Sequence, residues 1–198
     1  MMENIKEIPY GIANFVEVAE QNMYYVDKTM YLPLLEKQPR NLFFIRPRRF
    51  GKSIFLSMLR AYYDIAQKEK FQKRFGNLWI GSRPTPLQGK FQVVYLDFSR
   101  ASGGSGSLEE NFNNYCGMVM DLFGKVYEPY YFPGFAQKME EQPDFVRVLK
   151  RASYYFIPLK FSDIETVLFL YNFYSCSQSI AYFSKYVYPH GKFTVFHI

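Results

Sequence analysis

The octapeptide RPRRFGKS at residues 46–53 combines residue types and spacing that suit phosphate binding. A phosphate loop has the form GxxxxGK[ST]: its backbone N–H groups surround the phosphates, its lysine reaches the β and γ phosphates, and its hydroxyl binds Mg²⁺. Here only the first position departs from that form, because an arginine replaces the glycine. The pattern predicts binding of ATP with Mg²⁺ by Arg46, Pro47, Arg48, Arg49, Phe50, Gly51, Lys52 and Ser53.

The octapeptide could be a phosphate loop or only a basic surface turn that contains GKS. The residues on either side of it distinguish these two interpretations. Residues 41–45, NLFFI, form a short apolar run that is typical of a strand buried on both faces. From Lys52 to about Gln67, apolar residues recur every three or four positions, which predicts an amphipathic helix. A strand, a loop and a helix N-terminus in this order favour nucleotide binding, because the helix dipole attracts anions.

Asp97 ends a second predicted strand, at residues 91–98, and is a candidate metal ligand together with Ser53. A carboxylate at a strand end suits Mg²⁺, which prefers oxygen ligands. The next residue is Phe98, so no adjacent glutamate is present to orient an attacking water. The alternative is that Asp97 caps the following turn with Ser99, since aspartate is a frequent turn former.

Local signals predict two more helices. Asp27 precedes apolar residues at helical spacing and is placed to cap their first turn, although Pro33 could end that helix early. Ser107 and Glu110 have the spacing of a capping box, which predicts a helix reaching about Tyr127. Its apolar stripe is expected at Leu108, Phe112, Tyr115, Val119, Leu122 and Val126.

Charge is concentrated in the first half of the chain. The formal net charge is +6, and residues 1–100 hold 16 basic and 9 acidic groups, or +7. Such an excess suits a phosphate-bearing partner, either a nucleotide or a nucleic acid. Arg48 and Arg49 fit phosphate contacts, partner contacts or a solvated loop, and a nucleic-acid surface would use Lys68, Lys70, Lys73 and Arg74. No nucleic-acid-binding motif accompanies that run.

Several classes of protein are excluded by composition. Apolar residues make up 48% and charged residues 21% of the 198 residues, as in an ordinary globular domain. Cys116 and Cys176 form no CxxC pair and have no nearby histidine, so no zinc or redox motif is present. The start lacks the apolar core of a signal peptide, and no uninterrupted apolar run has the length of a membrane span. We therefore expect a cytoplasmic protein without a membrane partner.

Residues 152–198 differ from the rest of the chain. They are rich in aromatic residues and poor in charges, and no helical or strand period persists along them. We expect a loosely packed tail that is not part of the core, produced by truncation or a non-native continuation, or else covered by a partner. An unpaired sheet edge left beside such a tail would favour self-association.

Four segments in this order, IPYGIANF, YYVDKT, FFIRPRRFGKS and VVYLDFS, resemble the bacterial AAA-ATPase-like family over about residues 5 to 130. The resemblance implies an ATP-binding domain in which RPRRFGKS is the usual Walker A form, with Lys52 on the phosphates and Ser53 on magnesium. It also suggests that the tyrosines and Asp27-Lys28 border the adenine or ribose. The family's acidic Walker B strand and its PD-(D/E)XK nuclease-like domain are not found in residues 152–198, which implies a truncated chain.

Together these observations predict an α/β fold with a P-loop NTPase-type parallel sheet flanked by helices, here incomplete. Residues 1–151 form the predicted P-loop domain and residues 152–198 the atypical tail. The predicted function is ATP and Mg²⁺ binding, with hydrolysis doubtful because no Asp-Glu pair is present. The alternative is a non-catalytic interaction or nucleic-acid-binding module that keeps the loop as an element of the fold.

Overall fold

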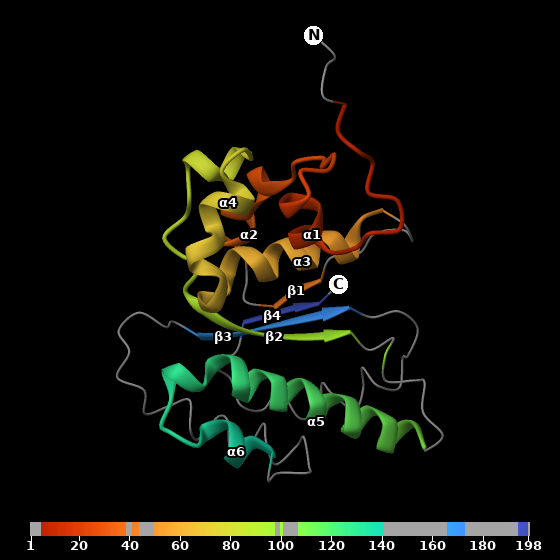
Figure 1. The fold of residues 1–198 in the computed structure, drawn as a ribbon, viewed down its shortest axis with the longest axis vertical. Coiled ribbons are helices and arrows are strands. Elements are labelled where there is room, and N and C mark those ends of the chain that lie inside the picture. Colours follow the sequence, from red (N-terminus) through yellow and green to blue (C-terminus); the bar gives the residue numbers. More distant parts are fainter. Residues whose placement is uncertain are drawn as a thin grey trace.

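The computed structural model of the chain describes residues 5–38, 41–43, 50–97, 100, 107–140, 166–172 and 194–197. These residues form a layered arrangement in which helices cover both faces of a sheet (Figure 1). The first four positions of the octapeptide RPRRFGKS, residues 46–49, lie outside the described residues.

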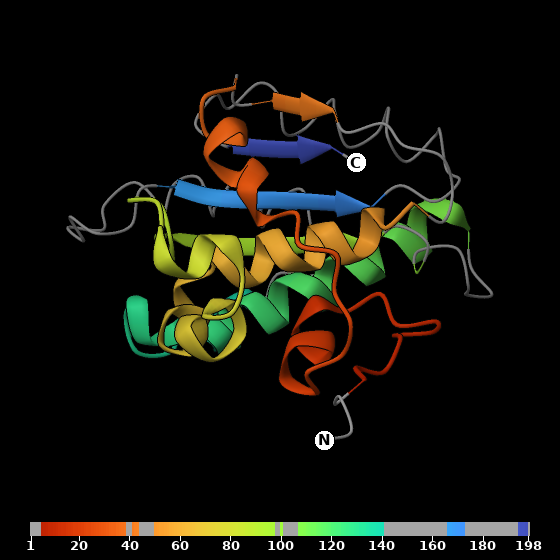
Figure 2. The same cartoon turned by 90° about the horizontal axis from the view of Figure 1, so that it is seen from above.

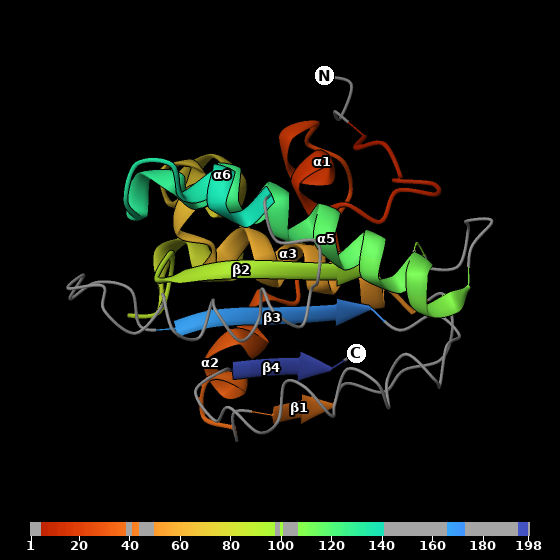
Figure 3. The same cartoon turned by 90° about the horizontal axis from the view of Figure 1, so that it is seen from below.

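The sheet has four parallel strands in the order β1-β4-β3-β2. The register aligns Phe43 with His197 and Asp97 with Asn172, so the carboxyl ends of the strands lie along one edge (Figure 3). The strands are β1 (Asn41–Phe43), β2 (Phe91–Asp97), β3 (Thr166–Asn172) and β4 (Thr194–His197).

Strands β3 and β4 lie within residues 152–198, which we expected to be a loosely packed tail outside the core, and this expectation is wrong for the two strands. Both lie between β1 and β2, in the centre of the sheet. Their sequences, TVLFLYN and TVFH, are short and mostly apolar or β-branched, which is typical of strands with a neighbour on each side. Such strands show no alternating pattern, so period analysis overlooks them. The proposed domain boundary at residue 151 stays a prediction.

Helix α3 (Lys52–Tyr63) covers one face of the sheet and runs in the direction opposite to the strands (Figure 2). It buries Phe55, Leu56 and Leu59, as its periodicity predicts, and continues the buried face at Tyr62 and Tyr63. The predicted end near Gln67 is wrong, because Asp64 leaves the helical conformation and caps a 3₁₀ helix instead. A buried aromatic cluster then joins this helix to its neighbours: Phe15, Tyr62, Tyr63, Phe75 and Phe91.

Helix α5 (Leu108–Tyr127) covers the other face, and the predicted capping box of Ser107 and Glu110 is present. The predicted apolar stripe is partly wrong. Leu122 and Val126 are exposed, whereas Cys116, Phe123 and Tyr127 are buried. Leu122 and Val126 nevertheless line the cavity between α5 and β2, while Tyr115 and Tyr127 reach the backbone of β2.

Shorter elements complete the described structure, mainly on the α3 side (Figure 1). Pro33 is compatible with its helix because it occupies the first turn, where no N–H is needed. Among the described residues, no helix has the length and apolarity needed to cross a membrane. The shorter elements are α1 (Phe15–Glu20), η1 (Thr29–Tyr31), α2 (Leu32–Leu35), η2 (Ile65–Lys70), α4 (Phe71–Phe75), η3 (Trp79–Ser82), η5 (Glu128–Tyr130) and α6 (Phe135–Glu140).

Candidate functional site

The GKS triplet forms the start of helix α3 at the carboxyl edge of the sheet (Figure 2). Gly51 is the N-cap residue and has a left-handed backbone, with φ of 74°. Glycine adopts this conformation readily, whereas a side chain would strain it. Lys52 and Ser53 are the first two residues of the helix, so the N–H groups of the first turn and the positive end of the helix dipole lie at this point.

A cavity of about 510 Å³ lies beside this helix start. Residues 10–13 of the N-terminal segment line one part of it and residues 51–54 line the other. The volume falls within the range of small-molecule sites. Tyr10 is exposed and Gly11 has a φ of 75°, so the chain turns sharply here and leaves its backbone accessible.

Hydrogen bonds hold the N-terminal segment in place on both sides of residues 10–13, which line this cavity. The backbone N–H of Phe15 donates to Ser57 Oγ over 3.0 Å, and Ser57 Oγ donates to Asn14 Oδ1 over 3.0 Å. On the other side, the N–H of Tyr24 donates to the carbonyl oxygen of Glu7 over 2.8 Å. Ser57 lies one turn after Ser53 on α3, so the segment is attached to the same helix that carries the GKS triplet.

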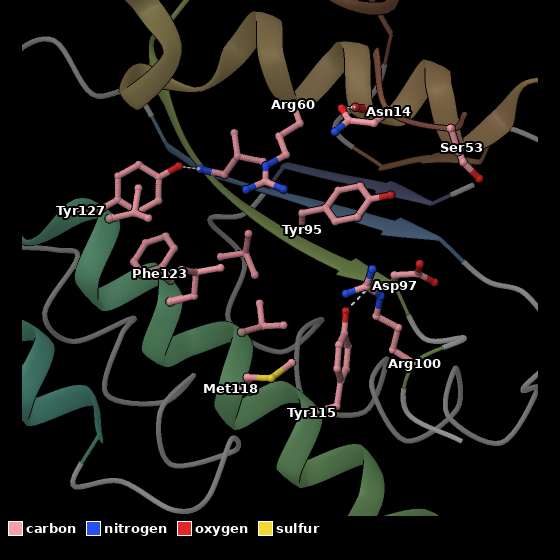
Figure 4. A pocket seen from close by; sticks show the side chains of 17 residues that line it. Asn14, Ser53, Arg60, Tyr95, Asp97, Arg100, Tyr115, Met118, Phe123 and Tyr127 are labelled. Atoms are coloured by element: carbon pink, nitrogen blue, oxygen red, sulfur yellow. Dashed lines mark hydrogen bonds between the residues drawn. The ribbon is translucent and has the colours of Figure 1, made fainter. Parts of the chain in front are cut away.

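A second cavity, of about 480 Å³, lies between α3, β2 and α5 (Figure 4). Ser53 and Asp97 both line it, and Figure 4 shows them at the same end with Arg100 close to Asp97. The opposite end is apolar and includes Phe123 and Tyr127 from α5. The two predicted metal ligands therefore share one cavity, although they come from different layers.

Asp97 lies in the strand farthest from β1, because β4 and β3 separate the two. At about 4.8 Å per strand spacing, its strand is about 14 Å from the one that leads into the loop. The backbone N–H of Asp97 donates to the hydroxyl of Tyr115 over 2.7 Å, which holds the strand end in place. The neighbour of Asp97 in the register is Asn172, the last residue of β3.

Asp27 has a structural role at the start of η1, although the N-cap residue of that helix is Lys28. Its Oδ1 accepts hydrogen bonds from the N–H and the hydroxyl of Thr29, over 2.8 and 2.7 Å. Its Oδ2 accepts a third from the backbone N–H of Trp79, over 2.7 Å. The carboxylate thereby joins η1 to η3, a contact that sequence analysis did not anticipate.

Arg74 does not belong to a nucleic-acid surface. Its side chain is buried and donates two hydrogen bonds to Glu20 Oε1, over 2.9 and 2.7 Å, and one to Gln67. The Arg74 guanidinium in turn lowers the pKa of Glu20. Of the four cations at residues 68, 70, 73 and 74, Arg74 is therefore buried and not on the surface. Its position in α4 directs its side chain toward α1.

Partly or fully buried tyrosines line the second cavity, and the buried carboxylate of Asp64 accepts a hydrogen bond from one of them, Tyr127. Burial raises the pKa of Tyr95 to about 12, so this phenol stays protonated at neutral pH. Burial also raises the pKa of Asp64, against the opposing effect of the hydrogen bond from Tyr127. Arg60 lies over the ring of Tyr95, 5.5 Å from its centroid. These groups order the wall of the cavity. In the sequence, Tyr115 indicates only a member of the apolar stripe, and Tyr127 only the approximate end of the helix.

In the described residues, a glycine-lysine-serine turn lies at the carboxyl edge of a parallel sheet, and Ser53 lines both cavities. A family described as Predicted AAA-ATPase matches residues 9–157. The chain therefore belongs to this AAA-ATPase-like family, as the four sequence segments suggested.

Comparison with curated proteins gives one relative of limited extent. It is a protein of Azotobacter chroococcum mcd 1 described as "Uncharacterized protein in vnfD 5'region", and it is 47% identical over 59 residues. The match spans 29% of this chain and 11% of the length of that protein. No solved structure matches the chain.

Proposed function

We propose that this chain is a P-loop domain that binds ATP together with Mg²⁺. The observation that carries the proposal is the position of Gly51, Lys52 and Ser53, which begin helix α3 at the carboxyl edge of the parallel sheet. Ligands of open α/β sheets bind outside the carboxyl ends of the strands. We further propose the P-loop NTPase class for the fold and the cytoplasm for its location.

The phosphates would lie at the start of α3. There Lys52 supplies a positive charge, and the N–H groups of the first turn supply hydrogen-bond donors. We assign Arg46, Pro47, Arg48, Arg49 and Phe50 to the remainder of the loop on the basis of the sequence motif.

The nucleoside would occupy the cavity between residues 10–13 and residues 51–54. This cavity begins at the GKS triplet, so a phosphate chain bound there leads directly into it. Tyr10 offers an aromatic ring near the opening. An exposed ring suits a purine base, because flat aromatic surfaces stack favourably.

Magnesium would be held by Ser53 and Asp97, and the residues present fit this ion. A hydroxyl and a carboxylate line the same cavity end, and Mg²⁺ commonly takes one or two carboxylates along with phosphate and water oxygens. Within the described residues, no cluster of three or more His, Cys, Asp and Glu side chains forms a self-sufficient metal site. The ion would supply neutralisation of phosphate charge.

We propose that the domain binds ATP without hydrolysing it efficiently, and the residues at the ends of the described strands support this. At their carboxyl ends they carry Phe43, Asp97, Asn172 and His197, so a single carboxylate is available. Phosphoryl transfer to water needs a group that positions the attacking water, in addition to charge neutralisation.

A titration of the purified chain with labelled ATP, with and without Mg²⁺, tests the proposal. Lys52→Ala should abolish binding while the circular dichroism spectrum stays unchanged, because the substitution removes a cation from the first turn and no core contact. Lys37→Ala removes an exposed lysine and should bind like the parent. Equal ATP affinity in the parent and Lys52→Ala would refute the assignment of the site.

The alternative of a nucleic-acid-binding or interaction module receives less support. A nucleic-acid-binding surface would need Arg74 to be exposed, but Arg74 is buried in an ion pair with Glu20. Binding of a short single-stranded oligonucleotide that competes with ATP would favour it.

A further inference from the structure

Lys28 lies in a turn whose backbone is fixed on both sides. The preceding residue, Asp27, binds Thr29 and Trp79 through its carboxylate. The following residue, Thr29, is fully buried, and its Oγ1 accepts a hydrogen bond from the N–H of Ile80 over 3.2 Å. Lys28 therefore projects from a backbone position that is held against η3 and has little freedom to shift.

The ammonium group of Lys28 reaches the phosphate loop. A Cβ atom added to Gly51 would lie 3.4 Å from Lys28 Nζ, an ordinary contact distance. Gly51 has no side chain, so the cation lies against the backbone of the residue that immediately precedes Lys52. Two lysines, separated by 23 intervening residues in the sequence, thus approach the same turn from different elements.

We propose that Lys28 is a second phosphate-binding cation, supplied from outside the Walker A motif, and this inference rests on the proposed function. In phosphate loops the backbone N–H groups contact the α and β phosphates, whereas the loop lysine reaches the β and γ phosphates. A cation beside Gly51 is therefore assigned to the α and β phosphates. Lys28 and Lys52 would divide the negative charge of the triphosphate between them.

The geometry favours phosphate over base or ribose as the partner of Lys28. The cavity proposed for the nucleoside is lined by residues 10–13 and 51–54, and Lys28 is not part of this lining. A lysine ammonium is a compact charge with three donors and suits phosphate oxygens. Asp27, in contrast, points its carboxylate to Thr29 and Trp79, which identifies it as the residue that positions Lys28.

Binding measurements on the full chain test the inference with three probes: ATP, ADP and inorganic tripolyphosphate. Lys28→Gln should weaken the binding of all three about tenfold, the loss expected for one charge-assisted hydrogen bond. Lys28→Arg should retain most of the affinity, because it keeps the charge. Lys37→Gln, at an exposed lysine, serves as the matched control and should bind like the parent.

The outcomes separate this inference from the proposed function. If the parent fails to bind ATP, or binds it as well after Lys52→Ala, the proposed function fails. If Lys52→Ala abolishes binding but Lys28→Gln leaves all three affinities unchanged, only the role of Lys28 fails. A loss confined to ATP and ADP, with tripolyphosphate binding intact, would place Lys28 at the nucleoside and overturn the assignment.

Chemical protection gives a second test that does not depend on the folding of a variant. Mild acetylation of the parent protein, followed by peptide mass spectrometry, measures the reactivity of each lysine. Saturating tripolyphosphate should protect Lys28 and Lys52 several-fold and leave Lys37 unprotected. Unchanged acetylation of Lys28 under conditions that protect Lys52 would overturn the inference.

Discussion

The hydroxyl of Tyr127 donates a hydrogen bond to the buried carboxylate of Asp64 over 2.8 Å. The same hydroxyl accepts one from the backbone N–H of Val93 over 2.9 Å. A single phenol thus joins the last turn of α5 to the end of α3 and to strand β2. The cavity that contains Ser53 and Asp97 is bounded by these three elements, so this contact stabilises the wall of the site.

Tyr127→Phe should lower the free energy of unfolding by about 1 to 3 kcal/mol, because it leaves a buried N–H and a buried carboxylate each short of a partner. Urea unfolding followed by circular dichroism measures this loss. Tyr24→Phe removes the hydroxyl of an exposed tyrosine and should change the free energy of unfolding by less than about 0.5 kcal/mol. Equal stabilities of the two variants would contradict the role given to Tyr127.

Asp64 should make stability depend on pH with a definite sign. Burial raises the pKa of Asp64 in the folded protein above 3.8, its ordinary value. The stability that this group contributes is therefore complete below about pH 3.8 and is lost as the pH rises through its folded pKa. The free energy of unfolding of the parent minus that of Asp64→Asn should decrease as the pH rises from about 3.8 through the folded pKa, and should level off above it. A difference that grows with pH would show that the pKa is lowered instead.

Gly51→Ala and Gly117→Ala should have opposite effects. Gly51 has a φ of 74°, so an alanine there should cost about 1 to 2 kcal/mol of backbone strain. Gly117 lies inside α5, with nothing within 4 Å of an added Cβ, so alanine should stabilise the protein by about 0.5 to 1 kcal/mol. Thermal unfolding of both variants measures the contrast. Stabilisation by Gly51→Ala would exclude the left-handed turn at the start of α3.

Asp27→Ala and Asp27→Asn should differ in stability. The alanine variant loses all three hydrogen bonds of the carboxylate, at about 1 kcal/mol each. The asparagine variant keeps an oxygen that accepts from Thr29, but it replaces the oxygen that binds Trp79 by an N–H donor. Its free energy of unfolding should therefore fall by less than that of the alanine variant. Urea unfolding measures both, with Glu69→Ala as a control at an exposed acidic residue. Equal losses in the two Asp27 variants would contradict the bond to Trp79.

Asp97→Asn and Ser53→Ala should each reduce the ratio of ATP affinities measured with and without Mg²⁺. Both remove an oxygen that the proposal assigns to the ion, and a neutral amide binds magnesium more weakly than a carboxylate. Ser57→Ala is the matched control, because it lies one turn along the same helix and bonds Asn14. It should leave this ratio unchanged. An unchanged ratio in Asp97→Asn would return Asp97 to a turn-capping role.

Much of α5 and of the start of α3 could be predicted because the relevant signals are local. The capping box at Ser107 and Glu110 is closed by two hydrogen bonds within four residues. The burial of Phe123 and Tyr127 was not predictable from the spacing, because it depends on how the helix packs; the hydroxyls of Tyr115 and Tyr127 accept from N–H groups of a distant strand. Their phenols count as apolar in a period analysis, although their hydroxyls decide how the helix docks.

The central position of β3 and β4 could not be predicted for a similar reason. Each strand is short and lacks an alternating pattern, and its hydrogen-bond partners come from segments distant in the sequence. The same holds for Arg74, whose neighbours in sequence are cations but whose partner is Glu20 on another helix.

The amino-acid sequence by itself determined the RPRRFGKS motif at residues 46–53, the helix that follows it and the family to which the chain belongs. These depend on residue type, spacing and capping over a few positions, which act before distant parts of the chain meet. The tertiary structure alone decided that Ser53 shares a cavity with Asp97, that Asp27 binds Trp79 and that Lys28 lies against Gly51. Contacts of this kind depend on how the layers pack, because only packing brings together groups that are separated by dozens of residues.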